Sequence, residues 1–115
     1  MTVEKELIFE GSALRDLKAF PDDPRREIGF ALHRLQVGEV PLIAKPFKTA
    51  GPGTWELRSD DADGWYRAIY VQIIKGKIHV LHCFQKKTRK TERADVEIAA
   101  KRFKAVKARQ TNESK

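Results

Sequence analysis

The sequence predicts a small single-domain α+β protein. An antiparallel β-sheet carries an N-terminal αα-hairpin on one face and is followed by a C-terminal helix, in the order β-α-α-β-β-β-α. Apolar residues recur at helical spacing within residues 12–37 and again within 92–109. Between them, residues 55–85 alternate and are rich in aromatic and β-branched side chains, as strands are. A chain of 115 residues without a repeat or a linker is expected to form one domain over residues 1–110, with a frayed tail over 111–115.

The N-terminal segment predicts one short strand and a brief helix. Glu6–Glu10 alternates as a strand does, and Gly11 ends it. Ser12 is a favourable N-cap because its hydroxyl can accept a bond from a free backbone N–H. The helix that it begins is expected to have its core stripe at Leu14, Leu17 and Phe20.

A second helix follows directly. Pro21 stops the first helix, and Pro24 suits the first turn of the second, which runs to about Val37 before Gly38 stops it. Its core stripe is Ile28, Ala31, Leu32 and Leu35. The resulting αα-hairpin is expected to cover one face of the sheet and to leave the other partly open.

Three consecutive antiparallel strands come after a proline-containing loop over residues 38–53. They are Trp55–Arg58, Trp65–Lys75 and Ile78–Gln85. On the middle strand, alternation groups Trp65, Arg67, Ile69 and Val71 against Tyr66, Ala68, Tyr70 and Gln72. On the third strand, it groups Val80, His82, Phe84 and Lys86 against His79, Leu81, Cys83 and Gln85. The last helix is predicted from Glu92 to about Arg109, with apolar positions at Ala94, Ile98, Ala99, Phe103 and Val106.

The charge balance is basic and uneven. Lys and Arg outnumber Asp and Glu by 23 to 16, a surplus of seven. Residues 86–109 alone carry a surplus of seven, because they hold ten basic residues and have Glu92, Asp95 and Glu97 as their acids. Such asymmetry predicts attraction to a polyanion or to an acidic protein partner, although a solvated helix face also explains it.

Several function classes are not indicated. No apolar run has the length of a membrane span, and the N-terminus does not resemble a secretory signal, so no membrane partner is expected. The single cysteine, Cys83, fits a reducing cytosol and a cytoplasmic location, and is expected to be a buried small hydrophobe. No metal-ligand spacing and no glycine-rich phosphate loop is found.

Arg67 is the unusual residue of the middle strand. A buried guanidinium without a partner is costly, so Arg67 must face either a counterion or solvent. One interpretation is a solvated sheet arginine paired with Asp60, Asp61 or Asp63. The other is a phosphate-binding arginine in a concave surface, completed by Arg58 and by the Lys86 and Lys87 pair.

The chain resembles the RelE/ParE superfamily of type II toxin–antitoxin toxins, and within it the phage-derived, HigB-like branch. The stretches that carry the resemblance are GSALRDLKAFPDDPRREIGFAL at Gly11–Leu32, AKPFKTAGPGTWELR at Ala44–Arg58, WYRAIY at Trp65–Tyr70, VLHCFQKKTRKT at Val80–Thr91 and ADVEIAAKRFK at Ala94–Lys104. They cover nearly the whole chain, and their combination in this order is more specific than any one of them.

The resemblance implies a RelE-like fold and a metal-independent, cofactor-free endoribonuclease. Such toxins enter the ribosomal A site and cleave the mRNA there, by attack of a ribose 2′-hydroxyl on the adjacent phosphate. It also implies a cognate antitoxin that neutralises the toxin, and a toxin–antitoxin complex that binds operator DNA through the antitoxin. A ParE-like gyrase inhibitor and an inactive antitoxin-binding or regulatory relative remain as alternatives.

The same resemblance suggests site residues. The expected catalytic residues are Arg67, Lys86 and His82, the last because it lies on a matching motif and a free imidazole gains or loses its proton near neutral pH. The expected RNA-binding residues are Arg58, Lys87, Arg89, Lys45 and Lys48. The lysines that RelE-like members often carry on the first of the three strands are replaced by Thr54 and Glu56, which favours the HigB-like branch and leaves the general base unassigned. A C-terminal catalytic tyrosine is also missing.

Overall fold

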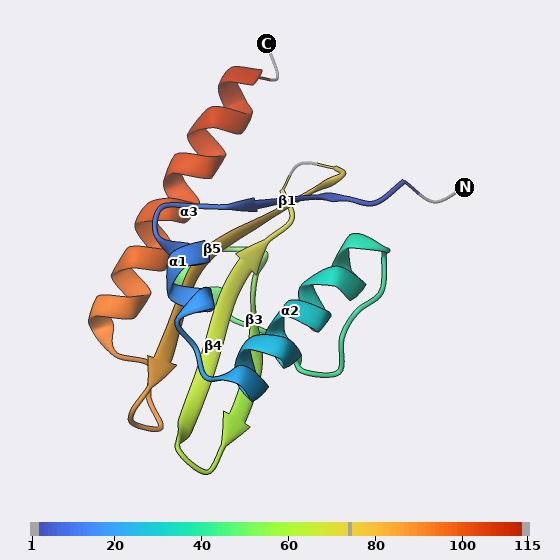
Figure 1. The fold of residues 1–115 in the computed structure, drawn as a ribbon. Coiled ribbons are helices and arrows are strands. Elements are labelled where there is room, and N and C mark those ends of the chain that lie inside the picture. Colours follow the sequence, from blue (N-terminus) through green and yellow to red (C-terminus); the bar gives the residue numbers. More distant parts are fainter. Residues whose placement is uncertain (1–2, 74, 114–115) are drawn as a thin grey trace.

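A five-stranded mixed sheet forms the centre of the computed structural model, which describes residues 3–73 and 75–113 (Figure 1). The elements in chain order are β1 (Glu6–Phe9), α1 (Ala13–Lys18), α2 (Asp22–Gln36), β2 (Ala44–Pro46), the short 3-10 helix η1 (Lys48–Ala50), β3 (Thr54–Asp61), β4 (Gly64–Val71), β5 (Lys77–Lys86) and α3 (Arg93–Glu113). The predicted α+β class and the succession of helices and strands are confirmed, and one strand is added.

The sheet is mixed, whereas an antiparallel sheet was predicted. Its order is β1-β5-β4-β3-β2, and β1 lies parallel to β5 with Glu6 opposite Lys77 and Phe9 opposite Val80. The helical hairpin carries the chain from β1 to the opposite edge, and the antiparallel strands then return until β5 lies beside β1. Alternation in a sequence indicates which side chains share a face, but it contains no information on the direction of a neighbouring strand.

β2 was predicted to be part of a loop. Ala44 pairs with Leu57 and Pro46 with Trp55, so this stretch is the edge strand beside β3. A proline is tolerated on an edge because its missing N–H is not needed by a further strand. Three residues are too few for alternation to be recognisable in the sequence.

The two faces of the sheet are covered by different helices. α1 and α2 pack on one face, against side chains that include Leu57, Tyr66, Ala68 and Val80. α3 and η1 pack on the other, against Ile69, Val71, Leu81 and Phe84. Figure 1 shows the helical hairpin and α3 on opposite sides of the strands. The first is called the hairpin face below and the second the α3 face.

A bulge in β5 changes the predicted faces of that strand. Ile69 pairs with His82 while Tyr70 pairs with Val80, so Leu81 is an extra residue between two ladder pairs. Val80 therefore packs on the hairpin face, and Leu81 joins the α3 face. The alternation predicted for β4 is confirmed, but the grouping of Val80 with His82 and of Leu81 with Cys83 is wrong.

The core stripe of α2 is confirmed, while that of α1 is partly wrong. Leu17 is buried as predicted, but Leu14 is 39% exposed and Ala13 is buried in its place. Ser12 does not cap the helix with its side chain, because its Oγ donates to Asp16 Oδ2 at 2.7 Å. A helix that begins at Ala13 and has only six residues turns its i and i+4 positions, here Ala13 and Leu17, to the sheet.

α3 extends to Glu113, past its predicted end at Arg109, and residues 114–115 of the predicted tail lie outside the described residues. Two arginines fasten it to the sheet. Arg102 Nη1 donates to the carbonyl oxygen of Leu81 at 2.9 Å, and Arg109 is paired with the Glu10 carboxylate. Among residues 3–73 and 75–113, no helix combines the length and the apolar character needed to cross a membrane.

We expect Phe103→Ala to lower the free energy of unfolding by about 3–4 kcal/mol, because Phe103 is 6% exposed and anchors α3 to its face of the sheet. Leu14→Ala should cost less than about 1 kcal/mol. Urea unfolding followed by circular dichroism measures both. Similar losses for the two variants would contradict the packing described for α1 and α3.

Candidate functional site

The part of the α3 face that lies next to the β3–β4 hairpin carries charged side chains. Cross-strand partners on antiparallel strands project to the same face. Arg58 is paired with Arg67, Asp60 with Trp65, and Trp65 in turn with Lys86. The structure thereby brings together Arg58, Arg67 and Lys86, three of the residues expected from the sequence to form a site.

Arg67 is the most buried of these cations, with a relative exposure of 2%. Its Nη1 lies 2.6 Å from Asp60 Oδ1 and also donates to the carbonyl oxygen of Tyr66 at 2.9 Å. Arg67 Nε is buried and has no hydrogen-bond partner within the described part of the chain. The pairing with Asp60 was one of the two interpretations, but it occurs on a covered face and not on a solvated one.

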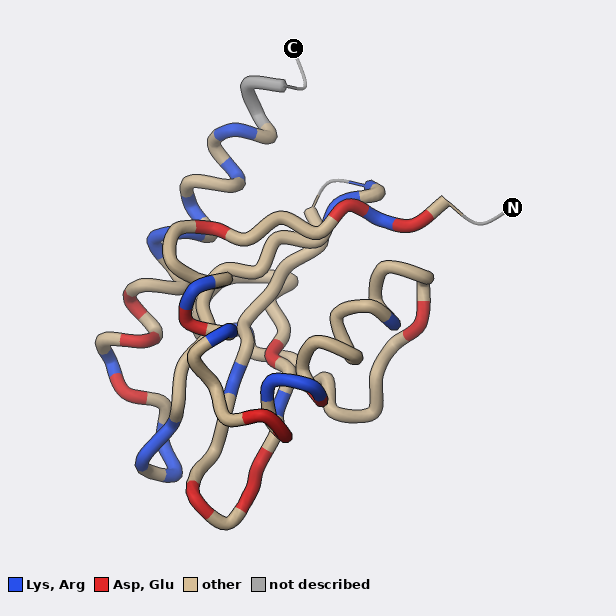
Figure 2. Tube along the Cα trace, in the orientation of Figure 1, with Lys and Arg blue, Asp and Glu red and all other residues tan. Residues whose placement is uncertain are grey.

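A shallow pocket of about 190 Å³ opens over this arginine. It is lined by Arg58, Asp60, Trp65, Arg67, Lys86 and Arg89, so four cations surround one carboxylate. A larger pocket of about 500 Å³ shares Lys86 and Arg89 with it and is also lined by Glu56, Phe47, Thr49 and the start of α3. The two pockets together are called the cationic groove, and the run of basic residues that follows β5 is visible in Figure 2.

Glu56 is a site residue that the sequence analysis treated only as a departure from a pattern. It is 7% exposed, and its Oε1 lies 3.5 Å from Arg58 Nε. Its Oε2 is buried and accepts no hydrogen bond from any described residue. Burial raises the pKa of Glu56, against the opposing influence of Arg67, Arg58 and Lys86. Its position two residues before Arg58 on an alternating strand was the signal that could have identified it.

Lys86 lines the larger pocket together with Glu56, and its pKa is shifted in the opposite direction. Burial lowers its pKa, and the neighbouring Arg67 and Arg58 lower it further, while Glu56 and Asp60 oppose the change. A carboxyl group with a raised pKa thus lines one pocket with an ammonium group whose pKa is lowered. Both shifts disfavour the charged form of the side chain.

His82 lies further along the same face but is held by α3. Its Nε2 is 2.8 Å from Asp95 Oδ1, and its ring stacks on Phe84 with centroids 4.9 Å apart. It does not line either pocket of the cationic groove. His82 therefore holds the first turn of α3 against the sheet through Asp95.

The remaining expected residues lie at different distances from the groove. Lys45, on β2, pairs with Glu56 of β3 and is exposed. Lys48, on η1, is also exposed, and neither lysine lines either pocket of the groove. Arg89 lines both pockets, and Lys87 lines an adjoining one beyond Trp65. Of the expected RNA-binding residues, Arg58 and Arg89 are thus the ones at the groove itself.

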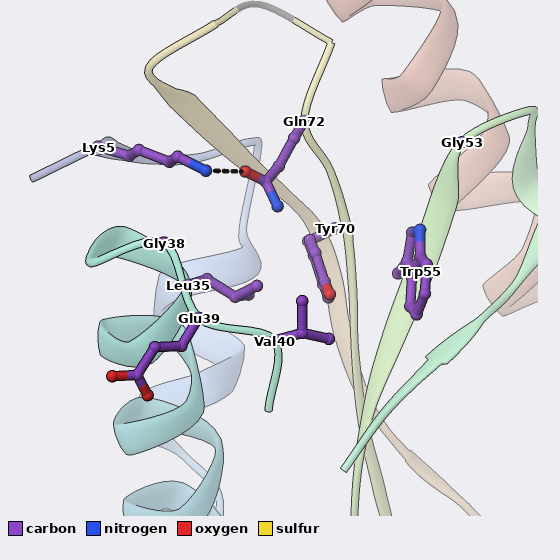
Figure 3. Close-up of a pocket in the computed structure, with 9 residues that line it drawn as sticks. All are labelled: Lys5, Leu35, Gly38, Glu39, Val40, Gly53, Trp55, Tyr70 and Gln72. Carbon is purple, nitrogen blue, oxygen red and sulfur yellow. Dashed lines mark hydrogen bonds between the residues drawn. The ribbon is translucent and has the colours of Figure 1, made fainter. Parts of the chain in front are cut away.

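A separate pocket of about 220 Å³ lies on the hairpin face, between the end of α2 and the sheet (Figure 3). Trp55, Tyr70 and Leu35 contribute apolar walls, and Lys5 Nζ donates to Gln72 Oε1 at 3.1 Å across its rim. It contains none of the expected site residues. The two charged side chains that line it, Lys5 and Glu39, have opposite signs, so it offers a phosphate no net attraction.

No cluster of three or more His, Cys, Asp or Glu side chains suited to a metal ion occurs among residues 3–73 and 75–113. The groups in the cationic groove are mainly nitrogen cations, which bind anions and repel metal ions. The chemistry of the groove is therefore that of an anion site.

Residues 15–104 match the family model described as Phage derived protein Gp49-like (DUF891). The chain belongs to this family. It is a RelE-like toxin family, which supports the resemblance to RelE-like toxins seen in the sequence. The match does not assign the chain to the HigB-like branch. No curated protein matches the chain.

The fold is similar to a solved one. In the crystal structure of the toxin–antitoxin complex RelBE2 from Mycobacterium tuberculosis, one chain superposes with a TM-score of 0.51 and is 24% identical. The match covers 73% of this chain and 100% of that one. At 24% identity the similarity establishes a RelE-like fold but does not establish the function.

We expect Glu56→Gln to be more stable than the wild type at pH 7 by about 1 kcal/mol, because it removes a desolvated charge. The sign follows from linkage. A carboxyl whose folded pKa is raised favours folding while it is protonated, and that contribution is lost as pH rises above its ordinary pKa of 4.5. The gain should disappear below that pH, where Glu56 is neutral in both states.

Urea unfolding at several pH values between 4 and 7 measures this difference, with the exposed Glu27→Gln as the control that changes the same charge elsewhere. A variant that is less stable than the wild type at pH 7 would show that the Glu56 carboxylate is well compensated in the folded state.

Proposed function

We propose that this protein is the toxin of a type II toxin–antitoxin system and that it inhibits translation as a ribosome-dependent mRNA endonuclease. The observation that carries the proposal is the cationic groove, in which Arg58, Arg67, Lys86 and Arg89 adjoin the buried carboxylate of Glu56. Cations hold and stabilise a phosphoryl group, and a carboxylate beside that group can act as its general base. The family to which the chain belongs supports the toxin assignment.

The proposed reaction uses the message's own 2′-hydroxyl. The Glu56 carboxylate takes the hydroxyl proton while the 2′-oxygen forms a bond to phosphorus. The bond from phosphorus to the 5′-oxygen breaks, and Lys86 donates a proton to that leaving oxygen. The products are a 2′,3′-cyclic phosphate and a 5′-hydroxyl, and each atom and charge is accounted for by the RNA and the two side chains.

The arginines stabilise the negative charge that develops on the phosphoryl oxygens. Arg67 is suited to this because Asp60 and its surroundings already hold it in one orientation, so little reorganisation accompanies the reaction. Arg58 and Arg89 are more exposed and are assigned to the RNA backbone on either side. His82 is assigned a positioning role, since its contact with Asp95 holds the start of α3 beside the larger pocket.

The proposed partners follow from the same groove. Translated mRNA in the ribosomal A site is the substrate, and the cognate antitoxin neutralises the toxin. The toxin–antitoxin complex would bind operator DNA through the antitoxin. The neighbour RelBE2 is a toxin–antitoxin complex, which supports an antitoxin partner here. Glu56 at the position where many RelE-like members carry lysine supports the HigB-like branch.

We expect induced expression in a bacterial host to arrest growth and to produce new 5′ ends within translated messages. Glu56→Gln and Lys86→Gln should each reduce cleavage by about 10²–10⁴-fold, the usual contribution of a proton-transfer group. Lys18→Gln on α1, an exposed residue of the hairpin face, is the matched control for Lys86→Gln and should cleave as the wild type does.

Growth arrest without new RNA ends would contradict the nuclease proposal and favour a ParE-like gyrase inhibitor. A folded wild type that neither arrests growth nor cleaves RNA would identify an inactive binding relative. Arg67→Ala is less suitable as a first test, because it leaves Asp60 without its counterion and a space in the sheet. Arg67→Lys, with unfolding measured in parallel, separates the loss of the guanidinium from loss of the fold.

A further inference from the structure

A third pocket, of about 460 Å³, lies at the end of the sheet where the β3–β4 hairpin approaches the end of β5. It is lined by Asp61, Ala62, Asp63, Gly64, Trp65, Gln85, Lys86 and Lys87. It differs from the cationic groove in its charge balance, because two carboxylates and an amide accompany its two lysines. It is called the hairpin pocket below.

The hairpin pocket adjoins the cationic groove through a shared wall. Trp65 and Lys86 line both this pocket and the 190 Å³ pocket over Arg67. A nucleotide whose phosphate lies among the cations of the groove would therefore have its base within reach of Trp65. Aromatic side chains beside a phosphate site are the usual means of holding an unpaired RNA base, by stacking.

The tip of the hairpin is held in a defined shape. Asp61 Oδ1 accepts hydrogen bonds from the backbone N–H groups of Asp63 and Gly64, at 2.8 and 3.0 Å. Gln85 Nε2 donates to the carbonyl oxygen of Asp63 at 3.3 Å. Gly64 leaves room for the end of the Gln85 side chain, because a Cβ there would meet Gln85 Nε2 at 2.3 Å. The carboxylate of Asp63 itself takes no part in these bonds and is exposed at the rim of the pocket.

We propose that the hairpin pocket binds a guanine base next to the scissile phosphate, and that Asp63 and Lys87 select it. Guanine presents two adjacent donors, N1–H and the N2 amino group, which match the two oxygens of one carboxylate. Its O6 is an acceptor that matches the Lys87 ammonium. Trp65 supplies the stacking surface that any base can use.

The other bases fit these groups less well. Adenine has no carbonyl oxygen for the lysine, and cytosine has one amino group flanked by an acceptor. Uracil presents two carbonyl oxygens and one N–H, so a carboxylate meets repulsion on one side. Each of these bases leaves the Asp63 carboxylate or the Lys87 ammonium without one of the hydrogen bonds that guanine makes, and the complex is weaker by that bond. This inference rests on the proposed function, because it assumes that the groove holds an RNA phosphate.

The test is equilibrium binding of short single-stranded RNAs that carry a 2′-deoxy substitution at the attacking ribose and therefore cannot be cleaved. Four oligonucleotides differ only in the base beside that ribose, and fluorescence anisotropy gives the affinity of the full-length protein for each. We expect guanine to bind about tenfold more tightly than adenine, cytosine or uracil. Asp63→Asn should reduce this preference to about twofold or less, while Asp23→Asn, at the start of α2 on the other face, should leave it unchanged.

Equal affinity for the four bases, or a guanine preference that persists in Asp63→Asn, would overturn the proposal. Mapping of cleavage sites with the same variants separates this failure from that of the proposed function. Cleavage without enrichment of guanine would leave the nuclease standing and reject the pocket. Guanine-selective binding without cleavage would support the pocket and reject the nuclease proposal. Circular dichroism of Asp63→Asn, compared with the wild type, distinguishes a loss of selectivity from a loss of structure.

Discussion

The ion pair between the buried Arg67 and the half-exposed Asp60 is the interaction on which the site depends. A guanidinium at 2% exposure is costly in a sheet unless a counterion compensates it, and Asp60, 2.6 Å away on the neighbouring strand, does so. β3 must therefore continue beyond Arg58 to bring Asp60 opposite Trp65 and beside the arginine. The result is a cation with one orientation, presented at the floor of a pocket that an anion can enter.

The groups around this pair modify one another. Glu56 is desolvated and its pKa is raised, although three cations oppose the change; Lys86 is desolvated and its pKa is lowered. Each of these perturbations disfavours the charged form and so costs stability at neutral pH. A fold that keeps such groups in one groove sacrifices stability there, which is the usual relation between an active site and its scaffold. The packing of α1, α2 and α3 on the two faces supplies the compensating stability.

Much of this arrangement could be predicted from the sequence, because it depends on local periodicity. The stripe Ile28, Ala31, Leu32 and Leu35 indicated the buried face of α2, and alternation placed Arg67 with Ile69 and Val71. The features that were missed depend on non-local pairing. The direction of β1, the extra residue Leu81 in β5 and the contact between His82 and Asp95 all arise from how segments meet, which periodicity does not encode. Glu56 was not among the predicted site residues because its raised pKa comes from burial, and burial of a charged residue is not visible in its sequence neighbours.

The central claim is that the groove promotes attack by the message's own 2′-hydroxyl. The most direct measurement uses purified protein and ribosomes programmed with a message in which the ribose at the mapped cleavage position is replaced by 2′-deoxyribose. The account predicts that cleavage at this position is lost, while binding of the protein to the ribosome is retained and the unmodified message yields a 2′,3′-cyclic phosphate end. Cleavage of the deoxy message at the rate of the unmodified one would contradict it, because the attacking oxygen would then come from water and not from the RNA.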